Sequence, residues 1–407
     1  MKILFVHQKF PAQFKHLVAA LATMPGNQIV AMHIQADAPV IPGVRVVGSK
    51  LKRGNSKGVH PWLKETESKI LRGEASWHTA KKLRAEGFVP DVIIAHPGWG
   101  ESLFLKDVWP EAKLLCYFEY YYRLIGADVG FDPEFPANDD IACVLRLKNA
   151  NNLLALEACD AGISPTYWQH STHPQEFQQK IAVIHDGIDT DAIVPSASVS
   201  ISLPGIEHAL SKDDEIITFV SRSLEPYRGF HIFMRTLPTL LAKRPRAQVL
   251  IVGSVGHGYG GHDDVSWKDK LLSEVSNQMD RLRVHFMGQV SHEVFVRILQ
   301  ISSVHIYLTY PFVLSWSMLE AMSAGCLIVG SRTLPVEEVI TDGENGLLVD
   351  FFSPDAIIAA IEEVFQHPTR MQHLRDAARR TVIERYDLKR ICLPQQIAQI
   401  HELVKKH

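Results

Sequence analysis

The feature that most constrains this chain is an alternation of short apolar runs with longer amphipathic stretches, which continues through both halves of the sequence. The apolar runs are rich in β-branched residues, as buried strands are. Such an alternation predicts two doubly wound, Rossmann-like α/β domains, each with a parallel sheet and helical crossovers. We expect strands at 3–7, 28–33, 91–96, 113–118, 161–164 and 181–185, and again at 215–221, 248–253, 283–288, 304–308, 327–330 and 346–350. Expected helices include 13–23, 229–242, 291–301 and 315–324.

Chain length and one irregular segment indicate where the domains divide. A chain of 407 residues is long for one hydrophobic core. The segment 196–214 is rich in Ser, Pro and Gly and lacks clear periodicity, so we interpret it as a linker. We expect an N-terminal domain at 1–195, a C-terminal domain at 215–385 and a final helix at 386–407 that can return to the N-terminal domain. Tandem domains of this class predict a ligand site in a central cleft, at the carboxyl ends of the strands.

Composition excludes several classes of protein. No apolar run approaches the ~18 residues that cross a bilayer. The apolar N-terminal run that ends at His7 is shorter than the about 7–15 residues of a secretory signal. The five cysteines are scattered and show no Cys-x-x-Cys pair, which argues against a disulfide framework and a thiolate metal site. These features predict a cytoplasmic protein.

Charge is distributed unevenly along the chain. Residues 1–90 contain 14 Lys or Arg and 5 Asp or Glu, although the whole chain has a net charge of −3. Between Arg45 and Arg84 there are 11 basic and 3 acidic residues. Two interpretations stay open: a solvated helical face, or a basic surface held against an anionic membrane leaflet on the inner side of the cell membrane. Nucleic-acid binding is not expected, because no zinc-finger, helix-turn-helix or RNP-like signature accompanies the charge.

The segment 309–326 is the most informative part of the second half. It follows an expected strand, turns through Pro311 and begins a helix near Ser315. Backbone N–H groups at a helix start are unsatisfied and carry partial positive charge, which makes this segment a candidate diphosphate site. A second segment, 221–230, places Arg222 and Arg228 at the end of the preceding expected strand, where guanidinium groups suit bidentate phosphate contacts.

These segments resemble the nucleotide-binding domain of glycosyltransferase family 4, the retaining enzymes of GT-B type. Arg222 and Arg228 match the family's Arg and Lys that contact the donor diphosphate. Glu320, within a Glu-Ala-Met-x-x-Gly segment, matches the carboxylate that accepts hydrogen bonds from the ribose hydroxyls. The turn with Gly288 and Val290 resembles the loop that holds the base through backbone groups.

The match covers nearly all of residues 215–385, including a segment at 335–349 that is similar to the family's Pro-Glu-x-Ile-x-Asp-Gly-x-Asn-Gly. The resemblance implies neither a metal nor another cofactor. It implies a set of donor-binding residues: Arg222, Arg228, Gly288, Val290, Phe312, Val313, Leu314, Ser315 and Glu320.

Three departures set the chain apart and make it similar to a divergent bacterial subgroup. Phe312 replaces the first Glu of the family's Glu-x7-Glu pair, and we interpret it as a packing or stacking residue. Glu119 stands where the family usually carries a His near the donor sugar. The segment 7–11 replaces the usual Gly-Gly turn after the first strand. His96 resembles a family His at a strand end, and its neighbours Gly98 and Gly100 would let the main chain approach a ligand closely.

We expect the catalytic residues to be Glu119, His96, Arg222 and Arg228. For Glu119 two interpretations stay open, a buried hydrogen-bonded group or a contact to the donor or acceptor sugar. Aromatic surroundings should raise its pKa by desolvation, unless a cation such as Arg123 offsets this effect. His96 is likewise either a structural residue or a sugar contact.

Local alternatives exist for other motifs. Ser317 and Glu320 also fit a capping box, with Ser at the N-cap and Glu at N3. The pairs Asp139–Asp140, Asp213–Asp214 and Asp263–Asp264 are typical of solvated turns, and no His spacing indicates zinc.

By resemblance, the chain is a metal-independent, retaining glycosyltransferase of hexosyl or N-acetylhexosaminyl type. Its donor would be a nucleotide-diphosphate sugar bound to the second domain. Its acceptor, a hydroxyl of a glycan, glycolipid or protein, would dock on the first, in bacterial surface-polysaccharide, glycolipid or glycoconjugate assembly. Two alternatives remain open: a GT-B sugar-nucleotide epimerase or phosphorylase, and a non-catalytic donor-binding partner of another transferase.

Overall fold

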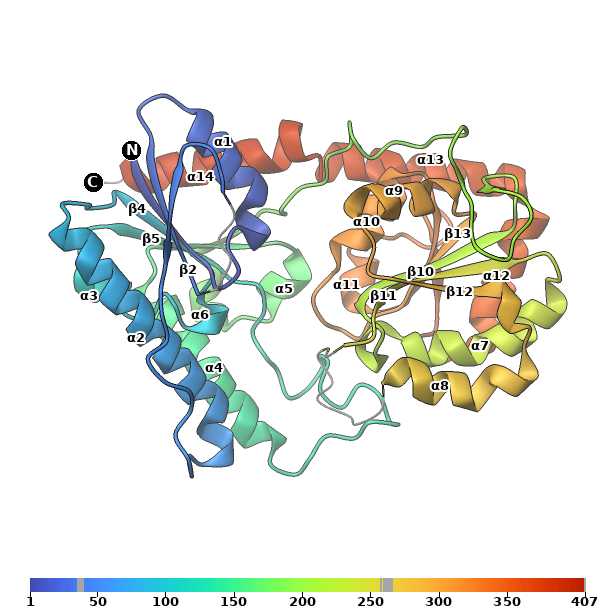
Figure 1. Cartoon of the computed structure of the whole chain (residues 1–407), viewed down its shortest axis with the longest axis horizontal. Helices are drawn as coiled ribbons and strands as arrows, with labels where there is room; N and C mark the ends of the chain where they lie inside the picture. Colours follow the sequence, from blue (N-terminus) through green and yellow to red (C-terminus); the bar gives the residue numbers. More distant parts are fainter. Residues whose placement is uncertain (35–39, 257, 259–265, 406–407) are drawn as a thin grey trace. The chain divides into compact units, whose positions relative to one another are not determined.

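The computed structural model describes residues 1–34, 40–256, 258 and 266–405. Two compact units account for the chain (Figure 1). The N-terminal unit contains Met1–Gly187 and Lys389–His407, and the C-terminal unit contains Ile188–Leu388. Each unit is a parallel sheet with covering helices, so the predicted α/β class is confirmed.

The N-terminal unit is built on a seven-stranded parallel sheet of order β3-β2-β1-β4-β5-β6-β7. Its strands are β1 (Lys2–Val6), β2 (Gln28–His33), β3 (Val44–Gly48), β4 (Val92–Ala95), β5 (Lys113–Tyr117), β6 (Ala161–Ser164) and β7 (Ile181–Val183). Its helices are α1 (Lys15–Thr23), α2 (Lys64–Ala85), α3 (Leu105–Val108), α4 (Ile141–Ala158), α5 (Tyr167–Ser171), α6 (Gln175–Gln178) and α14 (Leu393–Lys405).

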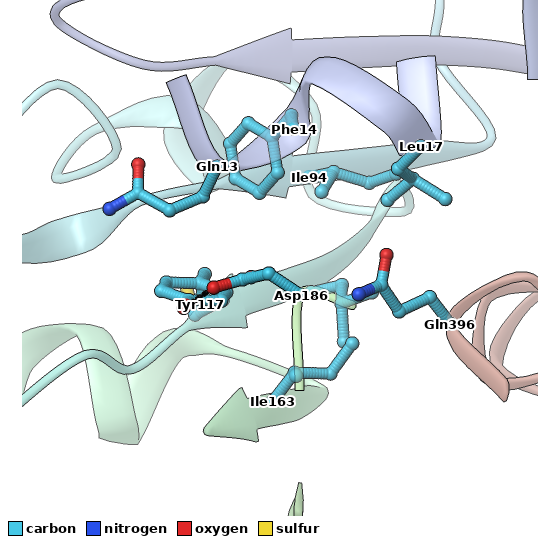
Figure 2. A pocket seen from close by; sticks show the side chains of 10 residues that line it. Gln13, Phe14, Leu17, Ile94, Tyr117, Ile163, Asp186 and Gln396 are labelled. Atoms are coloured by element: carbon cyan, nitrogen blue, oxygen red, sulfur yellow. Dashed lines mark hydrogen bonds between the residues drawn. The ribbon is translucent and has the colours of Figure 1, made fainter. Parts of the chain in front are cut away.

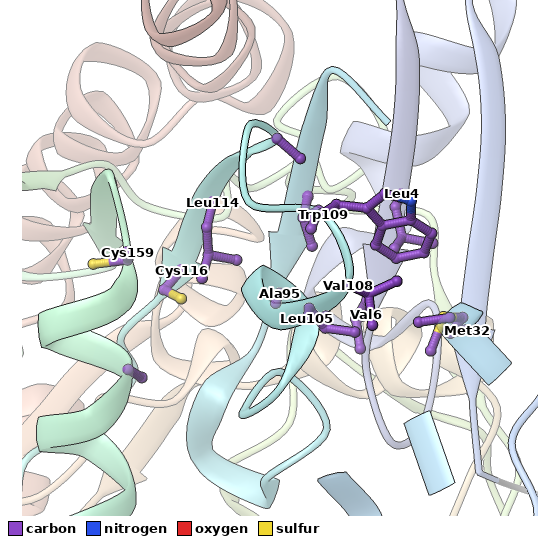
Figure 3. Close-up of a cluster of buried hydrophobic side chains, with 14 of the residues drawn as sticks. Leu4, Val6, Met32, Ala95, Leu105, Val108, Trp109, Leu114, Cys116 and Cys159 are labelled. Carbon is purple, nitrogen blue, oxygen red and sulfur yellow. The ribbon is translucent and has the colours of Figure 1, made fainter. Parts of the chain in front are cut away.

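Both faces of this sheet are buried because alternate residues of its central strands point to opposite sides. Leu4 and Val6 of β1 pack into one cluster with side chains of α2, α3 and α4 (Figure 3). Ile3 and Phe5 point the other way, into a second cluster with α1 and Ile400 of α14. The C-terminal helix is therefore part of the N-terminal core.

The C-terminal unit is built on a six-stranded parallel sheet of order β12-β11-β10-β13-β14-β15. Its strands are β10 (Ile216–Ser223), β11 (Gln248–Ser254), β12 (Val284–Gly288), β13 (Val304–Tyr307), β14 (Leu327–Ser331) and β15 (Leu347–Val349). Its helices are α7 (Phe230–Lys243), α8 (Trp267–Val275), α9 (His292–Ile301), α10 (Trp316–Ser323), α11 (Leu334–Glu337), α12 (Pro354–Gln366) and α13 (Pro368–Arg385). One cluster joins β13, β14, α9, α10 and α13 beneath the loops that follow the strands.

The prediction that 196–214 is an irregular linker is wrong. This segment carries a short antiparallel pair, β8 (Ser200–Ile201) and β9 (Leu210–Ser211), and buries Leu203 and Leu210 against β10, β11 and α9. The units divide instead at Gly187/Ile188 and Leu388/Lys389, so the expected boundaries at 195 and 385 are displaced. The segment was interpreted as a linker because two-residue strands leave no periodicity in a sequence.

Two further expectations concern an acidic pair and membrane-spanning helices. The pair Asp263–Asp264 lies outside the described residues. No helix in the described ranges is both long and apolar enough to cross a membrane.

Candidate active site

In the C-terminal unit, Arg228 ties the loop after β10 to the loop after β13. Arg228 lies in a short 3-10 helix, Pro226–Arg228, and its guanidinium is buried. Its Nη1 donates to Oγ1 of Thr309 at 2.9 Å and to the carbonyl of Val313 at 2.8 Å. The expected phosphate residue therefore also braces the loop 309–315, and its phosphate contact stays a prediction.

The start of α10 offers fewer main-chain donors than the sequence suggested. Ser315, the N-cap of α10, donates its N–H to the hydroxyl of Tyr307 at 2.8 Å, and its own Oγ accepts the N–H of Ser317. The N–H groups of Val313 and Leu314, just before the cap, have no partner among the residues that the structure describes. The unsatisfied donors thus lie one and two residues before Ser315, while the side chain of Leu314 packs into the core.

Phe312 is a packing residue, as its aromatic character suggested. It is 3% exposed and packs edge-on against Tyr227, with ring centroids 5.5 Å apart. The guanidinium carbon of Arg228 lies 6.0 Å from its ring centroid. The ring thus supports the Arg228 brace from the side.

Glu320 contacts His292, a residue that was not predicted from the sequence. Oε1 of Glu320, on α10, lies 2.8 Å from Nε2 of His292, the first residue of α9. Helix α9 follows β12 and the turn that contains Gly288 and Val290, so the predicted ribose carboxylate lies beside the predicted base-holding turn. Gly288 ends β12 with a φ of +65°, a left-handed conformation that favours glycine.

The capping-box interpretation of Glu320 is wrong. Ser315 caps α10, whereas Ser317 lies inside the helix, so Glu320 is not at the N3 position of a Ser317 cap. The carboxylate instead faces His292, on the neighbouring helix.

Arg222 differs from Arg228 in its surroundings. It lies near the end of β10 with an exposed side chain. Within the described ranges its guanidinium has no hydrogen-bond or ion-pair partner, whereas its carbonyl accepts from Ser254. Arg222 is therefore an exposed cation, whereas Arg228 is buried and holds the loop 309–315 in place.

In the N-terminal unit, His96 and Glu119 come together at the carboxyl ends of β4 and β5. Nε2 of His96 lies 3.6 Å from Oε2 of Glu119. The other carboxylate oxygen of Glu119 accepts a hydrogen bond from Nε2 of Gln13 at 3.2 Å. His7, which follows β1, places its ring centroid 5.2 Å from that of His96. Three strand ends thus contribute to one polar cluster.

This cluster holds Glu119 as a carboxylate. Burial works to raise the pKa of Glu119, but the nearby imidazole of His96 and the hydrogen bond from Gln13 outweigh it and hold the pKa below its ordinary value. The expected rise in pKa is therefore wrong. Arg123 is not the cation responsible, because its guanidinium donates to the carbonyls of Ser171 and Thr172. Burial, followed by the charge of His96, lowers the pKa of His7 to about 3, so His7 is neutral at neutral pH.

A second carboxyl group lies close by without a partner. Glu101 is 1% exposed, and both of its side-chain oxygens lack a hydrogen-bond partner in the described structure. Burial raises its pKa to about 7, against smaller opposing effects of its own main chain, Arg72 and His96. It therefore takes up a proton much more readily than Glu119.

Two glycines beside His96 allow close packing within the protein. A Cβ at Gly98 would lie 2.8 Å from Cε1 of His96, whose Nδ1 accepts the Gly98 N–H. A Cβ at Gly100, where φ is +101°, would lie 2.3 Å from the carbonyl of Lys69. The expected close approach is real, but its partners are the imidazole and α2.

Gln13, which contacts Glu119, also lines a pocket (Figure 2). In this view Phe14 and Leu17 lie on one side, and Tyr117 and Asp186 lie on the other. The Tyr117 hydroxyl donates to Asp186 at 2.9 Å, and its ring packs 5.6 Å from that of His96. The lining is mainly apolar, so this pocket is an extension of the core.

Four residues near the candidate sites were not predicted, because their sequence signals are weak. His7 directly follows β1, whereas Gln13 lies in the short helix Ala12–Phe14 and Glu101 follows the short helix Pro97–Trp99, and such positions mark many residues without function. His292 begins α9, just after the turn that follows β12, and carries no motif of its own. Within the described part of the chain, no group of three or more His, Cys, Asp or Glu side chains is placed to hold a metal ion.

Solved structures share this architecture over the whole chain. Sucrose-phosphate synthase from Thermosynechococcus elongatus matches with a TM-score of 0.73 and 16% identity, covering 100% of this chain and 99% of that one. HepE from Anabaena, in a complex with UDP and glucose, matches with a TM-score of 0.65 and 16% identity over 99% of both chains. Two parallel-sheet units of this kind define a GT-B-type fold, as predicted.

Sequence models give the family. Residues 25–193 match the model of the glycosyl transferase family 4 group, and residues 206–381 match that of the glycosyl transferases group 1. The chain belongs to glycosyltransferase family 4, which confirms the resemblance seen in its motifs.

Curated relatives match over part of their length. The phosphatidyl-myo-inositol mannosyltransferase of Mycobacterium tuberculosis is 26% identical over 225 residues, 54% of this chain and 53% of that protein. The D-inositol 3-phosphate glycosyltransferase of Rhodococcus jostii is 24% identical over 209 residues, 49% of this chain and 45% of that protein. The chain thus spans about half the length of the relatives it matches.

Proposed function

We propose that this protein transfers a sugar from a nucleotide-diphosphate sugar to an acceptor hydroxyl, with retention at the anomeric carbon and without a bound metal. The observation that carries the proposal is the grouping at one edge of the C-terminal sheet. There the free N–H groups of Val313 and Leu314 lie in a loop braced by Arg228, and Glu320 lies beside the turn before α9. Main-chain donors and guanidinium groups can stabilise the negative charge that grows on a departing diphosphate. Nucleotide-sugar complexes of a fold relative support the same assignment.

The His96–Glu119 pair is our candidate for the sugar side of the reaction. A carboxylate held ionised by its neighbours can accept hydrogen bonds from sugar hydroxyls and stabilise positive charge at the anomeric centre. The relatives include mannosyltransferases and inositol glycosyltransferases, so a hexosyl donor is the first choice.

The test begins with thermal shift against UDP-, GDP- and ADP-sugars, because a ligand that binds the folded state stabilises it by mass action. The donor that raises the melting temperature most is then incubated with the protein, and the released sugar or product is followed by NMR. We expect an α-linked donor to give an α-linked product. Dependence on inorganic phosphate, or an epimerised sugar, would favour the epimerase or phosphorylase alternative. Tight binding without donor hydrolysis or transfer would favour a non-catalytic partner.

We also propose that the basic segment 45–84 attaches the protein to an anionic membrane surface. Lys52 and Arg53 are exposed, and so are the apolar side chains of Leu51, Leu63 and Ile70. Exposed cations interact with anionic lipid through screened charges, so binding to anionic vesicles should fall steeply with salt. Charge reversal at Lys50, Lys52 and Arg53 should weaken binding further. Equal binding to neutral and anionic vesicles would count against a membrane role.

A further inference from the structure

A pocket lined in part by charged side chains lies in the C-terminal unit, away from the candidate donor edge. It has a volume of about 240 Å³ and is lined by residues before β10 and β14, by Gln300 at the end of α9, and by α13. These residues lie at the amino ends of the strands. The loops that carry Val313 and Arg228 lie at the carboxyl ends, because all six strands are parallel. The pocket is therefore separate from the donor site.

Three cations surround this pocket. Lys212 lies between β9 and β10, and Arg375 and Arg379 lie on α13. Gln372, Arg375, Asp376 and Arg379 occupy one face of α13, because positions three and four apart are neighbours on a helix. None of the three cations forms an ion pair with a described residue, and Asp376 is the only acidic residue in the lining.

The cations are held in place by main-chain carbonyls and not by carboxylates. Nζ of Lys212 donates to the carbonyl of Ser302, and Nη2 of Arg375 donates to that of Ser303 at 2.9 Å. Arg379 is bonded more fully: its Nη2 donates to the carbonyl of Thr190 at 3.1 Å, and its Nη1 donates to the carbonyls of Ile193 and Ser323. Ser302 is the C-cap of α9, so part of this positive charge offsets the negative end of a helix dipole.

After these contacts, Lys212 and Arg375 still have N–H donors without an acceptor among the described residues. An ammonium has three N–H donors and a guanidinium has five, and Lys212 and Arg375 each show a single acceptor. Nε of Arg375 is buried without a partner. Burial lowers the pKa of both Lys212 and Arg375, because positive charge is withdrawn from water, and for Arg375 the nearby Asp376 offsets only part of this effect.

We propose that this pocket binds the phosphate group of a small phosphorylated molecule, through direct contacts of Lys212 and Arg375, with Arg379 adding positive charge. A phosphate oxyanion accepts several hydrogen bonds, and a guanidinium with a free edge suits bidentate contact. The volume exceeds what a bare phosphate needs, so an organic group can accompany it. The site goes beyond the proposed sugar transfer and provides a place for an effector distinct from the donor.

The test uses the full chain and two probes, inorganic phosphate and glucose 6-phosphate, measured by calorimetry. We expect Arg375→Gln and Lys212→Gln to weaken binding of both probes at least ~10-fold while UDP affinity stays within about 2-fold. Arg370→Gln is the matched control, because it removes the same charge from an exposed position on the opposite face of α13, and it should change nothing. Tighter binding of glucose 6-phosphate than of inorganic phosphate would identify a phosphorylated metabolite as the ligand, whereas equal affinity would identify free phosphate.

A second variant separates binding from folding. Asp376 is exposed and accepts a hydrogen bond from Gln372, so Asp376→Asn should fold normally. Removing this negative charge from the rim should tighten phosphate binding about 2- to 3-fold. The proposal is overturned if both probes bind all these variants and the wild type alike, or if UDP displaces the phosphate in full, since either result would assign the phosphate to another site.

Discussion

The carboxyl edge of the C-terminal sheet presents main-chain N–H groups and guanidiniums, whereas the same edge of the N-terminal sheet presents a cluster of titratable side chains. In the C-terminal unit the candidate donor groups are fixed by local bonds, such as that from Arg228 to Val313. In the N-terminal unit, burial and the neighbouring His96 lower the pKa of His7, and His96 with Gln13 lowers that of Glu119 against the effect of burial.

The difference separates binding from chemistry. Permanent charges and backbone dipoles suit recognition of a diphosphate whose own charge does not change before reaction. Groups with tunable pKa values suit a step in which charge develops. We therefore expect substitutions in the C-terminal unit to act mainly on donor affinity and those in the N-terminal unit to act mainly on turnover.

The largest effect should come from Arg228→Met. The variant leaves the carbonyl of Val313 and the hydroxyl of Thr309 without their charged donor, and each such bond contributes about 1.5–3 kcal/mol. We expect donor affinity to fall roughly 100-fold, which is ~2.7 kcal/mol, with a lower melting temperature. Arg222→Met is the control, because Arg222 is exposed and should weaken binding without lowering the melting temperature. Wild-type donor affinity in Arg228→Met would show that the contacts of Arg228 with the loop 309–315 do not support donor binding.

Glu320→Ala should weaken donor binding by roughly 1.5–3 kcal/mol, the range for hydrogen bonds to charged groups. A nucleotide lacking both ribose hydroxyls sharpens the test, since only the wild type should discriminate against it. His292→Ala should cost less, because His292 is 66% exposed and its pairing with Glu320 is screened by water. Equal discrimination by wild type and Glu320→Ala would mean that the carboxylate does not meet the ribose.

The two units also differ in how far their sites could be predicted. The donor edge was predicted from short contiguous segments, because its groups are backbone amides and side chains within a few residues of one another. The N-terminal cluster is assembled from residues after three strands and from the short helix Ala12–Phe14, and the sequence identified His96 and Glu119 but not His7 or Gln13. Their proximity depends on strand order, which no local pattern contains.

The elements of the fold were likewise predicted where their signal is local to the sequence. All twelve expected strands occur within two residues of their predicted ends, because buried parallel strands are continuous apolar runs. The sequence missed β3, an edge strand with mostly half-exposed residues, and the two-residue strands β8 and β9. The pKa of Glu119 was mispredicted because desolvation can be read from aromatic neighbours in the sequence, whereas the opposing His96 contact depends on tertiary structure.

Glu119→Gln should cut turnover at least ~10-fold, about 1.4 kcal/mol of barrier, with donor affinity changed less than about 3-fold. Glu111→Gln, an exposed acid before β5, controls for loss of charge. Because the folded-state pKa of Glu119 lies below the ordinary 4.5, its ionised form contributes stability above that pH and loses it as the pH falls. Urea unfolding should therefore show a wild-type advantage at pH 7 that shrinks on acidification. A less stable variant with normal turnover per folded molecule would make Glu119 structural and leave His96 as the candidate sugar contact.

The smallest effect on the reaction should come from Phe312, although it occupies the position of a family carboxylate. Phe312→Leu keeps an apolar side chain against Tyr227 and loses an aromatic pair of about 0.5–1.5 kcal/mol, so stability should fall while turnover stays within about 3-fold. Phe312→Glu should give no gain in turnover, because the new carboxylate would be buried and the nearby Arg228 already donates to Thr309 and Val313. Turnover and urea unfolding, measured on both variants, separate these effects. A faster Phe312→Glu enzyme would show that the C-terminal unit also contributes a group to the chemical step, and the division between a binding unit and a reacting unit would fail at this residue.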